Sequence, residues 1–220
     1  MTTLLRIDSS SRTAASQSRA LGDYFEKSWQ TRDPGMRVVR RDLIAEPIPH
    51  IADRTIAGYY TPAEQFTPEL RAATALSERL ITELQSANVL LLTVPMYNFS
   101  IPSALKAWID QIVRIGYTFS YDGTNFGGLV KVKQAYVACA YGASGYTNGG
   151  PFSPYNFLEP YLNALLGFLG IAEVQFFSVQ ATTTDAATIA KHFDEAKRYI
   201  DTAIAKQFNT QSRQSQGALS

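Results

Sequence analysis

The sequence predicts an α/β domain in which a parallel sheet of five strands is covered on both faces by helices. Short strand-like runs alternate with long helix-like segments, as in repeated strand–helix–strand units. The run NVLLLTVP, residues 88–95, is mostly apolar and shows no polar alternation, as expected of a central parallel strand. Apolar residues make up 45% of the 220-residue chain, enough for one sizeable core. We expect a single domain over residues 1–205, followed by a disordered Ser/Gln-rich tail over 206–220.

The first strand–helix–strand unit lies at the N-terminal end of the chain. Residues 3–8, TLLRID, are expected to form the first strand and to run into a Ser-rich loop. Residues from about 17 to 30 predict a helix, because their large apolar side chains recur on one helical face. Pro34-Gly35 ends that helix, and the run at 36–41 predicts the second strand.

A longer connection separates the second strand from the third. Residues 45–66 hold several prolines, a glycine and aromatic residues, so we expect an irregular excursion there. Pro68 suits the first position of a helix that runs over 69–86 and leads into the central strand at 88–95.

The C-terminal half continues the alternation and adds one insert. This turn-rich insert is expected at residues 116–128, around TFSYDGTNFGG. The remaining elements are a helix at about 102–114, the fourth strand at 134–140, a helix near 157–168, the fifth strand at 173–179 and a last helix at about 185–205.

Charge and composition exclude several classes of function. The chain has 20 basic and 19 acidic residues, a net charge of +1, whereas nucleic-acid binders normally carry a basic excess. The single cysteine, Cys139, excludes an intramolecular disulfide, and with only His50 and His192 beside it we expect no metal site. No apolar run has the length of a membrane span and the N-terminus lacks a signal-peptide core, so we expect a soluble cytoplasmic protein.

The loop after the first strand is a candidate phosphate site. Open parallel sheets bind ligands beyond the carboxyl ends of their strands, and SSSRTAASQS, residues 9–18, lies between such an end and a helix N-terminus that favours an anion. The patterns GxxxxGK[ST] and GxGxxG are absent, which argues against NTP hydrolysis and an ordinary dinucleotide site. The serines have an alternative role as helix caps. The candidate phosphate ligands are Ser10, Ser16, Gln17 and Ser18.

The loop after the third strand, residues 95–102, gathers apolar side chains around one amide. Met96, Tyr97 and Phe99 suit a flat ligand that covers them, and Asn98 suits the polar edge of a heteroaromatic ring. The alternative is a loop folded into the core. The loop after the fourth strand, residues 141–150, is rich in glycine, which close approach to a ligand and flexibility explain equally well.

The other reactive residue types form no catalytic constellation. Asp8 ends the first strand without a second carboxylate beside it, so we expect no phospho-acceptor pocket. Cys139 falls within an apolar strand and is expected to be a packed core thiol, and His50 is expected to be a loop residue. Hydrolase chemistry is unsupported because the chain has no GxSxG motif and no serine with a partnered His.

Three segments carry a resemblance to a known family: VPMYNFSIPSALKAWIDQIVRIGYTFSY above all, then SSSRTAASQSRALGDYF and EPYLNALLGFLGI. With them the chain resembles the FMN-dependent NADH-azoreductases, also called FMN-dependent NADH:quinone oxidoreductases, of the flavodoxin-like superfamily. The resemblance covers nearly the whole chain apart from the tail. It implies a flavodoxin-like three-layer sandwich with strand order 2-1-3-4-5.

The resemblance also implies one FMN per subunit, with NADH or NADPH as the electron donor. Ser10 and the Ser16-Gln17-Ser18 turn would hold the phosphate, and the loop Pro95-Met96-Tyr97-Asn98-Phe99 would line the isoalloxazine ring. In the family a Ser-Arg-Gly-Gly stretch closes over the flavin. The matching residues here are Ala140, Tyr141, Gly142 and Ala143, so a hydroxyl and a guanidinium are lost, and Tyr141 is the residue left to stack on the flavin.

The implied activity is two-electron ping-pong reduction of quinones and azo compounds, with no catalytic side chain. A homodimer is implied as well, because Tyr121 and Phe168 match positions where the family places aromatic residues around the substrate at a dimer interface. Two other functions remain: a flavodoxin-type electron carrier with a protein partner, and a non-catalytic nucleotide-binding module. The near-zero charge argues against the first, and the Met-Tyr-Asn-Phe cluster against the second.

Overall fold

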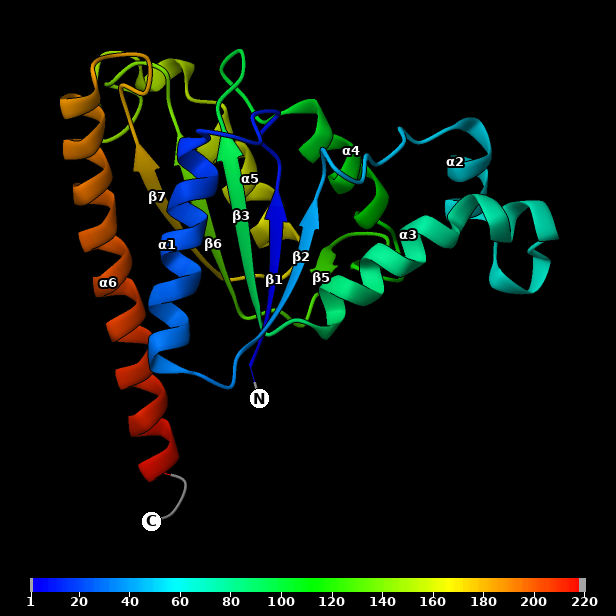
Figure 1. Cartoon of the computed structure of the whole chain (residues 1–220). Helices are drawn as coiled ribbons and strands as arrows, with labels where there is room; N and C mark the ends of the chain where they lie inside the picture. The colour runs from blue at the N-terminus through cyan, green and yellow to red at the C-terminus, as the bar shows by residue number, and fades with distance from the viewer. Residues whose placement is uncertain (1, 218–220) are drawn as a thin grey trace.

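The computed structural model describes residues 2–217 and contains a five-stranded parallel sheet (Figure 1). Its strand order is β2-β1-β3-β6-β7. This is the predicted order 2-1-3-4-5, because two short strands, β4 (Phe119–Tyr121) and β5 (Phe126–Gly128), belong to a separate hairpin. Neighbouring strands all pair in parallel, so their carboxyl ends meet at one edge of the sheet. The bounds are β1 Thr3–Asp8, β2 Arg37–Asp42, β3 Val89–Pro95, β6 Gln134–Ala140 and β7 Glu173–Val179.

Helices cover both faces of this sheet, which makes the predicted three layers (Figure 1). One face packs on α1 and α6, and the other on α3, α4 and α5. A shorter helix, α2 (Asp53–Tyr60), lies beside α3 within the excursion expected at 45–66. The bounds of the long helices are α1 Gln17–Arg32, α3 Pro68–Ser86, α4 Ser103–Ile112, α5 Leu158–Phe168 and α6 Ala186–Gly217.

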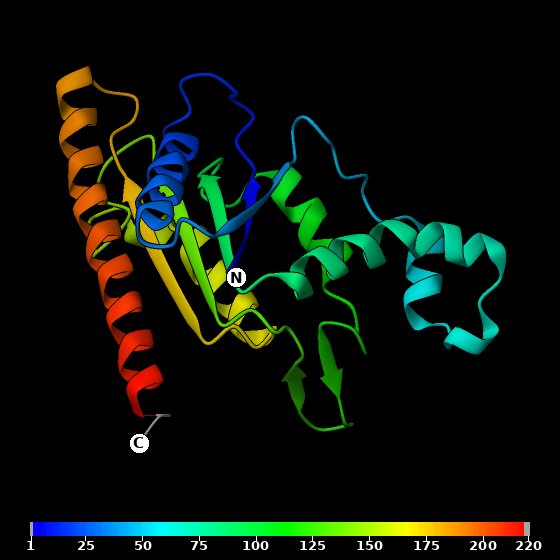
Figure 2. The same ribbon diagram turned by 60° about the horizontal axis from the view of Figure 1, so that its bottom comes forward.

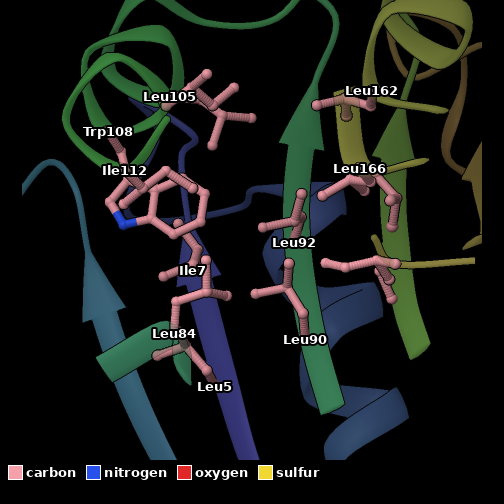
Figure 3. Packing of buried hydrophobic residues seen from close by; sticks show 14 of the residues in the cluster. Leu5, Ile7, Leu84, Leu90, Leu92, Leu105, Trp108, Ile112, Leu162 and Leu166 are labelled. Carbon is pink, nitrogen blue, oxygen red and sulfur yellow. The ribbon is translucent and has the colours of Figure 1, made fainter. Parts of the chain in front are cut away.

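Successive side chains of a strand point to opposite faces of the sheet, so each central strand contributes to two separate hydrophobic cores. Leu90 and Leu92 of β3 join the core beneath α3, α4 and α5, whose packing is drawn in Figure 3. Val89 and Leu91, which point the opposite way, join the core beneath α1 and α6. Every residue of β3 is buried, which explains why the sequence of this strand shows no polar alternation.

The core beneath α1 and α6 is built from large aromatic side chains. The Phe25 ring lies 4.7 Å from that of Tyr136, and Trp29 packs against both. Trp29 also contacts Phe208 of α6 at a ring distance of 5.3 Å. This contact continues the packed face of α6 past Ala205. The helix itself extends through Gly217, whereas the sequence predicts a tail from residue 206.

A glycine lets α1 lie close to the sheet. A Cβ atom added to Gly22 would stand 2.5 Å from Cγ2 of Thr93 on β3, well inside van der Waals contact. Any other residue at this position would therefore force α1 or the Thr93 side chain to shift.

The insert expected at residues 116–128 forms a β-hairpin (Figure 2). Its strands are β4 (Phe119–Tyr121) and β5 (Phe126–Gly128), and they make a separate antiparallel sheet. A Cβ on Gly128 would lie 2.2 Å from the backbone N of Gly170, so hairpin and α5 end meet backbone to backbone. Both figures show the hairpin at the amino edge of the main sheet, opposite the arrowheads of the strands.

None of the helices within residues 2–217 is both long and apolar enough to cross a bilayer.

Candidate functional site

A pocket of about 470 Å³ lies at the carboxyl ends of β1, β3, β6 and β7, and we call it the strand-end pocket. It brings together many of the residues proposed from the sequence as cofactor ligands: Ser10, Ser16, Gln17, Pro95, Met96, Tyr97, Ala140 and Gly142. The predicted residues that do not line it are Ser18, Asn98, Phe99, Tyr141 and Ala143.

The loop after β1 offers backbone donors to this pocket. Within the described chain, the N–H groups of residues 13–18 donate to no protein acceptor, neither in the loop nor in the first turn of α1. The backbone of Ala15 is in the left-handed region, with φ of 55°, which is strained for a residue other than glycine. Free N–H groups at a helix N-terminus form a general anion-binding arrangement.

The serines of this loop have two roles. Oγ of Ser16 accepts the N–H of Arg19 at 3.4 Å, so Ser16 is the N-cap of α1 and the capping alternative is confirmed for it. Ser16 also lines the pocket, so a cap and a ligand contact are compatible at this position. Ser18 is fully buried, and its hydroxyl lies 3.3 Å from that of Ser16.

The loop after β3 makes a tight left-handed turn. Tyr97 and Ser100 exchange backbone hydrogen bonds of 3.0 and 3.1 Å, and Asn98 and Phe99 between them have φ values of 48° and 71°. Two successive positive φ angles define a type I′ turn, in which the second position normally needs glycine. The N–H groups of Asn98 and Phe99 have no protein acceptor within residues 2–217. Strain and free donors together are typical of a binding loop.

The side chains of this loop divide between core and surface. Met96 packs against the core, whereas Tyr97 and Phe99 are 36% and 47% exposed, so the alternative of a loop wholly buried in the core is wrong. The Tyr97 hydroxyl accepts the N–H of Ser11 at 3.2 Å, which ties this loop to the loop after β1. Asn98 lines a neighbouring pocket of about 590 Å³ that also includes His50 and shares Tyr97.

The loop after β6 departs from the expectation for Tyr141. The sequence leaves this residue free to stack on a flavin, but its side chain is fully buried and its hydroxyl donates to Oε1 of Glu159 at 2.5 Å. Burial and the nearby carboxylate raise the pKa of the Tyr141 phenol. Its backbone N–H and carbonyl are also used, by Val179 and Thr182. The stacking prediction is therefore wrong, and only Ala140 and Gly142 of this stretch reach the pocket.

Several pocket residues were not predicted: Arg12, Ala15, Thr182, Thr183 and Ile189. Arg12 is exposed and forms no ion pair among the described residues. Its position inside the Ser-rich loop is the sequence signal that could have placed it at the same pocket. The threonines follow β7, a strand whose loop the sequence did not single out, although four consecutive strand ends contribute to the pocket.

Tyr121 and Phe168 lie away from the strand-end pocket. The Tyr121 ring stacks on Phe126 at 4.7 Å, and Phe126 contacts Phe168 at 5.4 Å, so both belong to an aromatic cluster of the hairpin. Figure 2 shows the hairpin that carries this cluster at the amino edge of the sheet, whereas the pocket residues lie at the carboxyl ends of the strands. One chain therefore does not bring these residues to the predicted flavin ligands.

A network of buried charges lies behind the loop after β1. Asp8 and Asp42 are neighbours in the β1–β2 register, so the expectation that no second carboxylate lies beside Asp8 is wrong. Arg6 donates to Asp8 at 3.0 Å, and Arg19 donates to Asp42 at 2.6 and 2.8 Å. The hydrogen bonds from Arg19 lower the pKa of Asp42 to about 2. Both carboxylates are engaged by arginines, so they form no open acidic pocket.

Cys139 and His50 lie where the sequence predicts. Cys139 is fully buried on β6, and burial raises the pKa of its thiol. His50 lies in the connection between β2 and α2. Within the part of the chain that the structure describes, no three His, Cys, Asp or Glu side chains are grouped to hold a metal ion.

Comparison with known proteins gives matches over nearly the whole chain. A family model described as a flavodoxin-like fold matches residues 2–204. The chain is similar to an FMN-dependent NADH:quinone oxidoreductase of Xanthobacter autotrophicus, with 56% identity over 80% of this chain and 84% of the relative. It is also similar to the FMN-dependent NADH:quinone oxidoreductase 2 of Trichormus variabilis, with 40% identity over 93% of this chain and 99% of that one.

The fold has solved counterparts. One is the crystal structure of an FMN-dependent NADH-azoreductase from Bacillus anthracis in complex with FMN, with a TM-score of 0.81. The match covers 94% of this chain and 99% of that chain at 23% identity. At this identity the likeness supports the fold alone.

Proposed function

The chain belongs to the FMN-dependent NADH:quinone oxidoreductases with a flavodoxin-like fold, and from this premise we propose that the strand-end pocket is its FMN site. The protein is an FMN-dependent oxidoreductase that uses NADH to reduce quinones. We extend its acceptors to azo compounds, because the exposed aromatic side chains beside the pocket suit planar molecules in general. The observation that carries the proposal is that the free backbone donors of the loop after β1 line one pocket together with Met96 and Tyr97 of the loop after β3.

The residues of the pocket fit the two ends of FMN. The loop after β1 combines free N–H groups, the Ser10 hydroxyl and the N-terminus of α1, which suit a phosphate dianion. Next to the pocket, the loop after β3 offers the N–H groups of Asn98 and Phe99, which suit the polar edge of an isoalloxazine ring. Met96 and Tyr97 add the apolar contact area that a flat ring system needs.

The chemistry that FMN supplies when bound is two-electron transfer, from NADH to an acceptor that later occupies the same place. The chain's own residues bind and orient the reactants. Backbone N–H groups at the ring's polar edge favour negative charge there. We assign no catalytic side chain, because solvent can supply the protons that the acceptor takes up.

The acceptor range follows partly from the loop after β6. The family arginine is absent at Tyr141, and the tyrosine that replaces it is buried, so this loop presents no cation to the acceptor. Anionic dyes therefore gain no ion pair from it. We propose that neutral quinones are reduced more efficiently than sulfonated azo dyes of similar size.

A homodimer with the active site at its interface is part of the proposal. The exposed hairpin residues Tyr121 and Phe126 form a stacked pair at the amino edge of the sheet. A second copy of the chain is the direct way to bring such a pair to a pocket at the carboxyl edge. We also propose a cytoplasmic location, since NADH is regenerated inside cells.

An electron carrier with a protein partner is less well supported. Electron-shuttle flavodoxins are strongly acidic proteins that dock on basic partners, whereas this chain has a net charge of +1. Rapid bleaching of the bound flavin by NADH would distinguish the enzyme from the carrier.

Visible spectroscopy and kinetics test the proposal together. The purified protein is expected to be yellow, or to gain flavin absorbance when FMN is added. Double-reciprocal plots with NADH and a benzoquinone are expected to be parallel, as in a ping-pong reaction at one shared site. A protein that stays colourless with FMN present would refute the cofactor site. Intersecting lines would refute the shared place for donor and acceptor.

A further inference from the structure

We propose that Arg19, a residue that does not line the strand-end pocket, positions the loop after β1 so that it can receive the phosphate of FMN. The inference rests on the proposed FMN site and adds a residue that acts behind it. Arg19 is a positioning residue, since its contacts are with the loop and not with the ligand.

Arg19 holds the loop at both of its ends. Its Nη2 donates to the backbone carbonyl of Ser10 at 2.9 Å, and its own backbone N–H donates to Oγ of Ser16 at 3.4 Å. Both serines line the pocket. The bond to Ser16 comes from the backbone, which glutamine or lysine at position 19 would also supply, so the bond to Ser10 is the one that depends on the arginine side chain. The strained backbone of Ala15 lies between the two serines.

The bond to the Ser10 carbonyl has a direct consequence for anion binding. A carbonyl oxygen facing a phosphate would repel it, whereas an N–H or hydroxyl attracts it. Arg19 takes the Ser10 carbonyl as its own acceptor. The Ser10 hydroxyl meanwhile accepts the N–H of Arg12 at 3.2 Å, which fixes the start of the loop from the other side.

Arg19 is itself held rigidly by β2. Its two Nη atoms donate to the two carboxylate oxygens of Asp42, a bidentate pair that fixes the plane of the guanidinium. The Asp42 carboxylate also accepts the N–H of Ile44 at 2.9 Å, so it is anchored in turn. The guanidinium that binds the loop is therefore held in place by Asp42 of β2 and is not a freely moving surface side chain.

The positive charge of Arg19 also favours phosphate binding at this loop. Asp8 and Asp42 are adjacent across the β1–β2 register, and Nη1 of Arg19 lies 3.8 Å from Oδ2 of Asp8. Removing Arg19 would leave two carboxylates close behind a phosphate-binding loop, with only Arg6 still paired to Asp8. Their repulsion would act on a phosphate dianion and not on an uncharged ligand.

The phosphate-specific effect can be separated from general stability with two flavins. Riboflavin has the same ring and ribityl chain as FMN but lacks the phosphate. The holoprotein is stripped of flavin, and the affinities for FMN and for riboflavin are measured by flavin fluorescence. Arg19→Gln is expected to weaken FMN binding by roughly ten- to a hundredfold while riboflavin binding stays within about twofold of the wild type.

Three further variants make the test specific. Arg40→Gln is the matched control, because Arg40 joins the same charge network through Glu26 but does not contact the loop. Arg19→Lys keeps the positive charge but cannot form the bidentate pair with Asp42, so an intermediate loss of FMN affinity is expected. Arg19→Gln combined with Asp42→Asn restores the charge balance without restoring the tether, and FMN binding is expected to stay weak.

The outcomes divide clearly. Equal weakening of FMN and riboflavin by Arg19→Gln, or unchanged FMN affinity, overturns the inference. Full recovery of FMN affinity in the double variant also overturns it, because charge alone would then account for the effect. If circular dichroism shows that Arg19→Gln is unfolded, Arg19→Lys decides by the same FMN-to-riboflavin ratio. The wild-type protein tests the FMN site itself before any variant is compared. That site is refuted if the wild type binds riboflavin with the same affinity as FMN, or if it binds neither flavin.

Discussion

The hydroxyl of Tyr141 donates a 2.5 Å hydrogen bond to Oε1 of Glu159, which joins the end of β6 to the first turn of α5. Tyr146 stacks on the same tyrosine at a ring distance of 5.7 Å, and Phe152 contacts Tyr146 in turn. Tyr141, the position that the resemblance matches to a family arginine, is therefore part of the packing that folds this loop. It supports the pocket from within instead of facing the ligand.

Tyr141→Phe is expected to destabilise the protein with little effect on flavin binding. The substitution removes one buried hydrogen bond to a carboxylate, worth roughly 1–3 kcal/mol in the free energy of unfolding. Urea unfolding of the flavin-free protein measures the loss, and an FMN titration measures the affinity. Tyr155→Phe, at an exposed tyrosine, is the control and should change neither value. Weakened FMN binding without loss of stability would contradict the buried role.

Ala15→Gly is expected to stabilise the protein. Ala15 has φ of 55°, a conformation that glycine adopts without strain, so the free energy of unfolding should rise by roughly 0.5–1 kcal/mol. The neighbouring Ala14 has no positive φ, so Ala14→Gly should lower stability by a similar amount through chain entropy. Thermal unfolding of the two variants side by side gives the comparison. A loss of stability in both would show that the loop relaxes around Ala15.

Asp42 is expected to make stability depend on acid pH. Hydrogen bonds from Arg19 lower the pKa of Asp42 from 3.8 to about 2 in the folded protein. A carboxyl with a lowered pKa stabilises the fold above its unfolded value, near pH 4, and the contribution disappears as the pH falls toward 2. The loss is on the order of 1–2 kcal/mol. The difference in unfolding free energy between wild type and Asp42→Asn should shrink across this window. A difference that stays constant from pH 5 to pH 2 would refute the lowered pKa.

Cys139 is expected to be inert in the native protein. Its side chain is fully buried on a central strand, and burial raises the pKa of the thiol, so little thiolate forms near neutral pH. A thiol reagent such as DTNB should titrate no cysteine in the native state and one after unfolding in guanidinium. NADH:quinone activity should survive the reagent. Fast labelling of the native protein would show that β6 opens locally.

Tyr121→Ala is expected to lower turnover without removing flavin. If the hairpin of one chain completes the site of another, kcat/KM for a benzoquinone should fall by roughly tenfold, while FMN content and the sedimentation of a dimer stay unchanged. Tyr199→Ala, at an exposed tyrosine of α6, is the control. Normal turnover by the Tyr121 variant, or a wild type that sediments as a monomer, would count against the shared site.

The sheet and the pocket were predictable from the sequence to different degrees. The apolar run of β3 and the alternation of strands and helices indicate the layers, because a strand that is buried on both faces consists mostly of apolar residues. The loop motifs indicate most of the pocket. The direction of the Tyr141 side chain cannot be predicted from composition, since an aromatic residue at a strand end suits either a ligand or the core. The contribution of Thr182 and Thr183 depends on how β7 lies beside β6, a contact between distant parts of the chain.

The hydrogen-bond partners of Arg19 could not be predicted from the sequence either. The arginine lies 23 residues from Asp42 along the chain. The β1–β2 register sets Asp42 beside Asp8, and the position of α1 brings Arg19 to both. The same holds for α6 beyond Ala205, where the polar composition indicates a tail although Phe208 packs against Trp29 of the core. Pairwise tertiary contacts of this kind are not encoded in local patterns.

The strand-end pocket is assembled from four loops that are widely separated in sequence, which links cofactor supply to the amount of folded protein. Such a site exists only when the whole sheet has formed, so FMN binds the native state and not the unfolded chain. Free FMN at about a hundred times its dissociation constant would add about 2.7 kcal/mol to the free energy of unfolding. Chains made when flavin is scarce would unfold more often and meet proteases more often. The abundance of the enzyme would then follow the flavin status of the cell without any change in its synthesis.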